Sequence, residues 1–219
     1  MKSEADTKNL EFVLANTALT AAPLVPEIRL RLADNVLPLW QRTERLGAGD
    51  PPPPYWAFAW PGGQALARYI LDNSSRFRGK SILDFGAGSG LVGIAAVKAG
   101  ARAVAAEIDS LAVTAIEANA RANNLEISCL EEDIIGRDEG WDTVCFGDMC
   151  YERPLAQRIF GWAGALKKRG AHVLLGDPGR DYFSQTNVSR LATYSVPTSR
   201  DLEDRDVRET SVYEMQAKA

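Results

Sequence analysis

Histidine and cysteine are scarce in this chain. Its 219 residues include one histidine, His172, and three cysteines. A single histidine cannot build a histidine-rich metal site or serve both parts of a hydrolase mechanism, so we expect His172 to be structural. The cysteines are odd in number, form no C-x-x-C pair and lie in or just after predicted strands, which favours buried, reduced thiols. They are Cys129, Cys145 and Cys150. The composition therefore predicts no metal site.

Long apolar runs and a strong excess of one charge are also missing. No run is long enough to cross a membrane. The N-terminus has no apolar signal region and carries Glu4 and Asp6, which argue against a transit peptide. The 25 basic and 29 acidic residues give a net charge of −4, which argues against a nucleic-acid backbone as the main partner but leaves a local basic patch open. We therefore expect a cytoplasmic protein that acts without a membrane.

Residues 80–90 hold the glycine-rich stretch around which the chain is organised. Ser81–Phe85 predicts a buried strand, because it is short, apolar and rich in β-forming residues. Glycines follow at every second position, and the apolar residues from Leu91 predict a helix that ends at Gly100. Glycine lets a ligand approach the backbone closely, and the free N–H groups at a helix start favour polar or anionic groups. The loop therefore predicts a nucleotide-like ligand.

The register of the glycines decides between two classes of ligand. Gly88, Gly90 and Gly93 satisfy the dinucleotide pattern G-x-G-x-x-G, but this register starts two residues too late and places Gly93 inside the helix. The better match is Asp-x-Gly-x-Gly-x-Gly, which begins at Asp84. A carboxylate at this turn repels a pyrophosphate and attracts a ligand that carries an ammonium and a sulfonium. The register therefore argues against a nicotinamide oxidoreductase.

Residues 84–90 resemble motif I of the class I S-adenosylmethionine (AdoMet) methyltransferases. The resemblance implies AdoMet as the cofactor and S-adenosylhomocysteine as its product, with Asp84 and the loop in the binding site. The loop residues are Gly86, Ala87, Gly88 and Gly90. A glycine-rich turn without a ligand is the alternative interpretation.

Strands and helices alternate through the rest of the chain. This order predicts an α/β fold with a mostly parallel, Rossmann-like sheet and helices on both faces. The last two strands have no helix between them, which indicates a hairpin with one antiparallel strand, as in the seven-stranded methyltransferase sheet. Residues 1–50, helical over 7–46, form an N-terminal extension, and residues 51–219 form the methyltransferase domain. The predicted later strands are 102–107, 126–131, 141–147, 171–176, 190–196 and 208–216, and the helices are 64–71, 110–124, 153–168 and 181–188.

Acidic residues stand where the second and third strands of the domain end, the edge at which such sheets bind ligands. Glu107 can accept both ribose hydroxyls through its two oxygens, and Ile108 can cover one face of the adenine. Asp133 can accept from the adenine amino group, with Ile134 stacked nearby. A single acid at a strand end is usually just solvated. Together with Asp84 and the glycine loop, these acids resemble the AdoMet-binding order of the methyltransferases.

An aromatic segment follows the proline-rich break at residues 47–54. Trp56, Phe58 and Trp60 alternate, which places three aromatic rings on one side of an extended segment. A Pro-Gly-Gly turn then leads into a helix. The segment predicts an apolar wall over the methionine end of the cofactor, or a hydrophobic cover for the first strand of the domain, and the two roles are compatible.

The fourth strand of the domain ends in Asp148 and Tyr151. Methyltransferases of bases and amides typically carry an Asn/Asp-Pro-Pro-Tyr/Phe motif here, and this chain lacks both prolines. Its Asp-x-x-Tyr resembles the motif of a group of protein-lysine methyltransferases, which implies that Asp148 accepts from the substrate amine and Tyr151 walls the alkyl chain. The alternative is a helix cap at Asp148 with a packed Tyr151. We expect the amine to lose its proton to solvent before attack, and Glu152 and Asp177 are the alternative candidates for a general base.

Several segments together resemble the lysine methyltransferases of the electron-transfer flavoprotein β-subunit. These segments are residues 24–32, 38–41, 55–63 and 176–180. The resemblance runs over most of the chain and implies transfer of methyl groups from AdoMet to lysine side chains of a protein, with that β-subunit as the expected partner. Ribosomal-protein lysine methyltransferases have a similar core, and small-molecule or nucleic-acid methyltransferases share the cofactor half, so these remain alternatives.

Overall fold

The computed structural model describes residues 4–45 and 52–217. Within these ranges, one sheet contains the strands β3 (Ser81–Phe85), β4 (Arg102–Glu107), β5 (Ser128–Glu131), β6 (Thr143–Gly147), β7 (His172–Asp177), β8 (Val188–Pro197) and β9 (Val207–Met215). They lie in the order β5-β4-β3-β6-β7-β9-β8. Strand β9 runs antiparallel to β7 and β8, and the other pairs are parallel. The predicted seven-stranded sheet with one antiparallel strand is confirmed.

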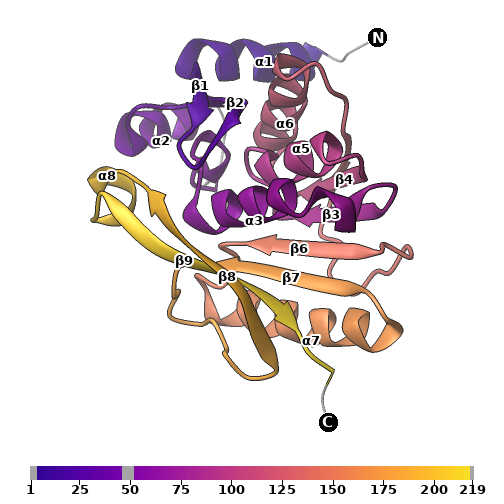
Figure 1. Ribbon diagram of the computed structural model, residues 1–219. Helices are drawn as coiled ribbons and strands as arrows, with labels where there is room; N and C mark the ends of the chain where they lie inside the picture. The colour runs from indigo at the N-terminus through magenta and orange to yellow at the C-terminus, as the bar shows by residue number, and fades with distance from the viewer. Residues whose placement is uncertain (1–3, 46–51, 218–219) are drawn as a thin grey trace.

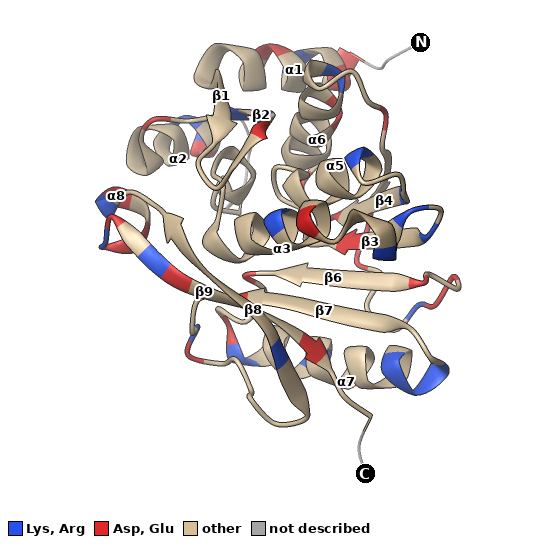
Figure 2. Ribbon diagram, viewed as in Figure 1, with Lys and Arg blue, Asp and Glu red and all other residues tan. Residues whose placement is uncertain are grey.

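Helices cover both faces of this sheet (Figure 1). One face carries α3 (Pro61–Asp72), α5 (Leu91–Lys98) and α6 (Ser110–Ala122), and the other carries α7 (Arg153–Arg169). Successive strand side chains point to opposite faces, so Ile82 packs in the cluster under α3 and α5, while Leu83 packs in the cluster with α7. The central strands β3, β6 and β7 are therefore buried on both faces, as their apolar sequences predict, and β6 carries no charged residue (Figure 2).

The strand order reverses at β3. From β3 the chain moves outward through β4 to β5, and it then returns to the other side of β3 with β6. The connections after β3 and after β6 therefore leave the sheet on opposite sides. A crevice forms at such a point beyond the carboxyl ends of the strands, and the functional site is expected there.

The first 45 residues combine two helices with a β-hairpin. Helix α1 (Glu4–Asn16) packs against α6, the hairpin consists of β1 (Ala18–Ala22) and β2 (Val25–Leu32), and α2 (Val36–Glu44) follows. The prediction of a helix throughout residues 7–46 is therefore wrong for the hairpin. From Ile28 to Arg31, buried apolar residues alternate with basic ones, which is the period of a strand with one buried face. Backbone N–H groups of β2 also donate to the amides of Asn119 and Asn123 on α6, a contact that no local pattern reveals.

Smaller differences from the prediction lie in the connections. A 3₁₀ helix, η1 (Tyr55–Ala57), replaces the extended start of the aromatic segment, and two short helices that were not predicted, α4 (Ser74–Phe77) and α8 (Arg200–Glu203), lie in connections. Residues 181–187 form two turns joined by an irregular segment instead of the predicted helix, with Asn187 at a left-handed φ of +57° just before β8 begins at Val188. The predicted domain boundary at residues 50–51 and most of the proline-rich break lie outside the described residues. In the described ranges, no helix is long and apolar enough to span a membrane.

Candidate functional site

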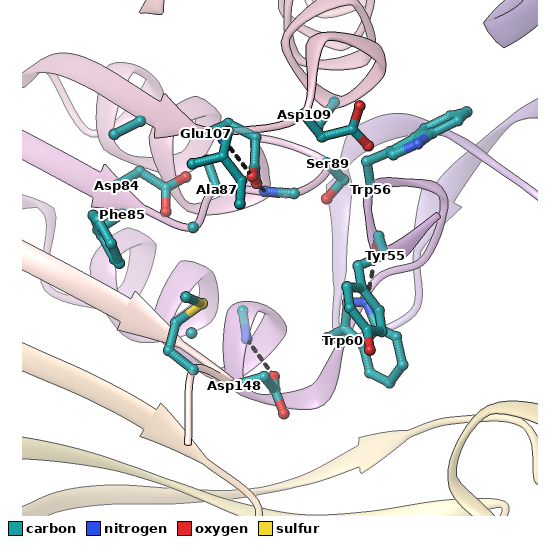
Figure 3. A pocket seen from close by; sticks show the side chains of 18 of the residues that line it. Tyr55, Trp56, Trp60, Asp84, Phe85, Ala87, Ser89, Glu107, Asp109 and Asp148 are labelled. Carbon is teal, nitrogen blue, oxygen red and sulfur yellow. Dashed lines mark hydrogen bonds between the residues drawn. The ribbon is translucent and has the colours of Figure 1, made fainter. Parts of the chain in front are cut away.

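A cavity of about 460 Å³ opens at the carboxyl ends of β3, β4 and β6. Its wall contains every predicted site residue except Gly90 and Ile134. Figure 3 shows Asp84, Ala87, Glu107 and Asp109 along one side of the cavity, and Asp148 with Tyr55 and Trp60 along the other. The sequence therefore identified most of the wall. We call the side with Asp84, the glycine loop and Glu107 the cofactor side, and the side with Tyr55, Trp60, Asp148 and Tyr151 the acceptor side, after the ligands expected there.

The glycine loop needs its glycines for two reasons. Gly86 and Gly88 line the cavity with φ values of +62° and +53°, a left-handed conformation in which side chains are strained. The Gly88 N–H donates to Glu107 Oε2 over 2.9 Å, which ties the loop to the end of β4. Gly90 does not line the cavity: a Cβ there would lie 2.9 Å from Ile116 Cγ2, so this glycine lets α5 pack closely against α6. Ala87, between the two lining glycines, also faces the cavity.

Asp84 joins the end of β3 to helix α5. Its side chain is 2% exposed, and its Oδ2 accepts from the Gly93 N–H over 2.8 Å. Burial raises the pKa of Asp84 to about 7, against the opposing effect of the Gly93 N–H, and the nearby Glu107 raises this pKa further. Near neutral pH this carboxyl is therefore poised between its two forms, and a cation in the cavity would favour the ionised one.

Glu107, the last residue of β4, and Ile108, which follows it, lie on the cofactor side of the cavity. Glu107 Oε1 accepts from the Ile108 N–H over 2.9 Å, and Oε2 accepts from the loop as described above. A carboxylate oxygen can accept two hydrogen bonds, so each oxygen retains one position for a ligand hydroxyl. Burial raises the pKa of Glu107, and these N–H groups lower it in part. Ile108 lines the cavity and is 69% exposed, so its side chain is free to cover one face of a bound ligand.

Of two consecutive isoleucines after β5, only the second reaches the cavity. Ile134 is fully buried in the cluster under α7, whereas Ile135 lines the cavity. Asp133 does face the cavity, and its Oδ2 pairs with Arg158 Nη2 over 2.5 Å. This hydrogen bond from Arg158 lowers the pKa of Asp133. Successive side chains point in alternate directions here, so Ile134 enters the core and does not reach the cavity. Ile135 takes the place in the cavity wall that was predicted for Ile134.

The aromatic segment both covers the core and lines the cavity. Trp56 and Phe58 are buried in a cluster with residues of α2 and α6, and both also face the cavity. The Trp56 indole N–H is buried without a hydrogen-bond partner among the described residues. The rings of Tyr55 and Trp60 meet edge to face at 5.7 Å, and Tyr55 lies 5.5 Å from the ring of Tyr151. The two interpretations of this segment therefore hold together, and Tyr55 is a wall residue that the alternation missed.

Tyr151 closes the aromatic side of the cavity. It is 40% exposed, and burial of its hydroxyl raises its pKa to about 12, so the side chain is neutral at physiological pH. Met149, two residues earlier, lies over the glycine loop, where a Cβ on Gly86 would be 2.3 Å from its Sδ. The acceptor side of the cavity is therefore walled by apolar and aromatic groups.

Asp148 sits where the N-terminus of α3 meets the ends of β6 and β7. It is 8% exposed, and its Oδ2 accepts from the N–H groups of Gly62 and Gly63, the latter over 3.3 Å (Figure 3). A Cβ on Gly62 would lie 2.2 Å from the Gly176 carbonyl oxygen, so the helix touches the strand end through glycine. Asp148 thus caps α3, a helix 86 residues away in the sequence, and not the helix that follows it. Its predicted contact with a substrate amine stays a prediction.

An arginine that the sequence did not single out completes this side. Arg180 donates from Nη2 over 2.7 Å and from Nε over 3.1 Å to Asp148 Oδ1, and it lies 5.7 Å over the Trp60 ring. The same guanidinium pairs with Glu203 on α8, over 2.5 Å to Oε1. Burial raises the pKa of Asp148, and the positive charge of Arg180 acts against that rise. Arg180 ends the Gly-Asp-Pro-Gly-Arg segment after β7, so its position just after a strand could have identified it as a site residue. No feature of the sequence points to Glu203.

The two further candidates for a general base do not line the cavity. Glu152 is exposed at the N-terminus of α7. Asp177 Oδ1 accepts from the N–H groups of Gly179 and Arg180 over 2.7 and 2.8 Å, and burial raises the pKa of Asp177 to about 6. Among the residues that the structure describes, Asp148 is therefore the carboxylate on the acceptor side of the cavity wall.

Comparisons with known proteins point to methyltransferases. A family model described as ribosomal protein L11 methyltransferase (PrmA) matches residues 65–145. The electron transfer flavoprotein beta subunit lysine methyltransferase of Xenopus laevis is 41% identical over 211 residues, which cover 92% of this chain and 85% of that protein. The protein of the same name from Homo sapiens is 39% identical over 217 residues, covering 94% of this chain and 81% of that protein.

Solved structures give the same fold at low sequence identity. The magnesium protoporphyrin IX methyltransferase of Synechocystis PCC 6803 with bound SAM has a TM-score of 0.53 at 15% identity. The match covers 70% of this chain and 79% of that one. At this identity it shows a shared architecture and leaves the acceptor open.

Proposed function

Since the chain belongs to the family of the electron transfer flavoprotein beta subunit lysine methyltransferases, we propose that it methylates lysine side chains of that β-subunit. The observation that carries the proposal is 41% identity over 92% of the chain, which includes the acceptor side as well as the cofactor side. The predicted cytoplasmic location is a separate proposal, which cell fractionation can test.

The cofactor side fits AdoMet in size and in chemistry. The volume of the whole cavity lies in the range of about 300–1,000 Å³ that is usual for small-molecule sites. Asp84 would face the positive charge, Glu107 would accept from the ribose, and Ile108 and Ile135 would cover the adenine. AdoMet, when bound, supplies a methyl group activated by a sulfonium. The chain supplies orientation and excludes water through the glycine loop and the aromatic wall.

The acceptor side fits an alkyl chain that ends in an amine. The rings of Tyr55, Trp60 and Tyr151 would contact the methylene groups of a lysine and exclude water from its amine. Asp148 and Tyr151 remain our candidates for the groups nearest the amine. A nucleic-acid base would need planar hydrogen-bonding partners here, and the described wall offers aromatic rings instead.

Ribosomal protein L11 is the second candidate substrate. The matching family model supports it, but that match spans residues 65–145, which lie mainly on the cofactor side and stop before Asp148 and Arg180. The acceptor side therefore has no counterpart in that match. For this reason we place the flavoprotein first.

A direct competition distinguishes the two substrates. The purified protein is incubated with radiolabelled AdoMet and equal amounts of electron-transfer flavoprotein and ribosomal protein L11. We expect label in the β-subunit alone, and mass spectrometry of its peptides then gives the lysine and the number of methyl groups. Label in L11 alone would replace the proposed substrate, and label in neither would reject both. A parallel reaction with Glu107→Ala controls for contaminating methyltransferases.

A further inference from the structure

Four charged side chains form a chain of contacts beside the acceptor side of the cavity. Asp148 pairs with Arg180, Arg180 pairs with Glu203, and Arg208 Nε lies 3.2 Å from Glu203 Oε2. Each of these side chains is less than one quarter exposed. Two carboxylates and two guanidinium groups alternate, so the chain of contacts carries no net charge.

The Asp148 carboxylate has no free acceptor position. Oδ2 takes the N–H groups of Gly62 and Gly63, and Oδ1 takes Nε and Nη2 of Arg180. A carboxylate offers about four lone-pair positions, and here four donors occupy them. An ammonium that enters the cavity therefore meets a carboxylate that is already paired.

The remaining titratable groups near this carboxylate do not restore a free negative charge at the cavity wall. Burial raises the pKa values of the Cys150 thiol and the Tyr151 hydroxyl to about 12, and it raises that of Tyr55, so all three are neutral at pH 7. Asp177 is turned to two backbone N–H groups. Among the described residues, the other acids that line the cavity lie at or just after the ends of β3, β4 and β5, away from Asp148, and Glu152 is exposed. These acids are Asp84, Glu107, Asp109, Glu132 and Asp133.

We infer that Arg180 keeps the acceptor lysine neutral, by occupying the one carboxylate that would otherwise hold the lysine as an ammonium. The inference rests on the proposed function. A free lysine has a pKa of about 10.4, an unpaired carboxylate would raise that pKa, and a neighbouring cation or an apolar wall lowers it. The ammonium gives its proton to water as it enters, and its nitrogen keeps the lone pair. That lone pair would form the new N–C bond as the bond between the methyl carbon and sulfur breaks, with the electron pair of the broken bond left on the sulfur of S-adenosylhomocysteine. In this account Arg180 is a positioning residue, and no side chain of the wall has to act as a base.

The test compares Arg180→Met with Arg180→Lys. Methionine frees the Asp148 carboxylate, so we expect the pH profile of kcat to move toward higher pH by about one unit or more, with about tenfold lower kcat at pH 7 for each unit. Lysine keeps the charge, and we expect it to keep the wild-type pH profile. Arg200→Gln is the matched control, because Arg200 belongs to the same short helix as Glu203 but forms an exposed pair with Asp206. We expect no change in that variant.

A second measurement does not depend on turnover. Calorimetry of β-subunit binding to the enzyme loaded with S-adenosylhomocysteine, in buffers of different ionisation enthalpy, counts the protons released. We expect release in the wild type and its loss in Arg180→Met. Asp148→Asn removes the carboxylate and keeps Arg180, so its pH profile should move in the opposite direction, toward lower pH. This variant also serves if Arg180→Met does not fold.

The outcomes separate this inference from the proposed function. If the wild type methylates the β-subunit but Arg180→Met or Asp148→Asn retains the wild-type pH profile, the inference is overturned and the function stands. If the wild type does not methylate the β-subunit, the proposed function fails first. Equal loss of activity at every pH in Arg180→Met and Arg180→Lys would show a purely structural role for Arg180 and would also overturn the inference.

Discussion

The two sides of the cavity differ in how far apart in the sequence their parts lie. On the cofactor side, Asp84 reaches Gly93 over nine residues and Glu107 reaches Gly88 over 19 residues. On the acceptor side, Asp148 reaches the start of α3 over 86 residues and Arg180 over 32 residues. One side is built by a strand, a loop and the next strand, and the other exists only once four distant segments have met.

This difference predicts different consequences of substitution. A change on the cofactor side removes a contact with the ligand from a frame that folds locally. A change on the acceptor side removes a contact between α3, the strand ends and α8, because the same side chains that face the cavity also hold these elements together. We therefore expect stability to fall most on the acceptor side and AdoMet affinity to fall most on the cofactor side.

The strongest test of this comparison is Gly62→Ala. A Cβ at this position would lie 2.2 Å from the Gly176 carbonyl oxygen, 2.5 Å from Asp148 Oδ2 and 2.7 Å from the Asp148 backbone nitrogen. The backbone at both strand ends would therefore have to shift. We expect a loss of roughly 3 kcal/mol or more in the free energy of unfolding, measured by urea denaturation.

Gly63→Ala is the matched control for that variant. Its Cβ would meet nothing within 4 Å, so we expect its stability to stay within about 1 kcal/mol of the wild type. Equal stabilities for the two variants would show that the close contact of α3 with β7 does not hold the acceptor side together.

The next largest effect is expected for Glu107→Ala, on the cofactor side. Hydrogen bonds to a charged group are worth about 1.5–3 kcal/mol, so the loss of this carboxylate should weaken AdoMet binding by about 10- to 100-fold, measured by calorimetry. Glu131→Ala is the control, since Glu131 lies opposite Glu107 on the neighbouring strand β5 but does not line the cavity. Unchanged affinity in Glu107→Ala would reject the ribose contact.

The sequence predicted the cofactor side well because that side is local. The spacing of Asp84 and the glycines, and the acid at the end of the next strand, are written in consecutive residues, and a strand–loop–helix converts that spacing directly into geometry. Gly90 and Ile134 were assigned to the site because spacing alone does not say which residues face the cavity. Gly90 meets α6 and Ile134 enters the core, and both outcomes depend on tertiary packing.

The acceptor side could be predicted only in part for the opposite reason. Asp148 was identified from its place at a strand end, but its partners, Gly62 and Arg180, come from segments that no local pattern connects to it. Glu203 reaches this side from the link between two strands, a charged segment whose composition is that of any solvated loop. The hairpin of residues 18–32 was missed although residues 28–31 alternate as a strand does, because this run is short and the contacts with α6 that hold it are distant in the sequence.

The next expected effect is smaller, and it is a pH dependence that the Asp84 carboxyl gives to the cofactor side. The pKa of Asp84 is raised to about 7 in the folded protein, so its contribution to folding stability is greatest below its unfolded pKa and is lost as the pH rises through 7. A cationic ligand favours the ionised form. AdoMet affinity should therefore rise between pH 6 and pH 8, by up to about tenfold for each unit below 7, with release of a proton on binding at pH 6.

Asp84→Asn measures the share of this residue in that pH dependence. The variant cannot ionise, so the slope of AdoMet affinity against pH should become clearly shallower, while Glu107, whose pKa burial also raises, accounts for what is left. The same slope in the variant as in the wild type would assign the effect to other groups.

The smallest expected effect tests whether a site residue can be told from a core residue within the cofactor side itself. Ile108 is 69% exposed and Ile134 is fully buried. Ile108→Ala should leave the free energy of unfolding nearly unchanged and weaken AdoMet binding about fivefold, because the ligand loses an apolar cover worth about 1 kcal/mol. Ile134→Ala should lower the free energy of unfolding by about 2–5 kcal/mol and leave the affinity of the folded protein unchanged. The two substitutions have opposite effects on stability and affinity only if Ile134 points into the core and Ile135 into the cavity. A loss of affinity in Ile134→Ala would therefore restore the adenine contact first predicted for Ile134.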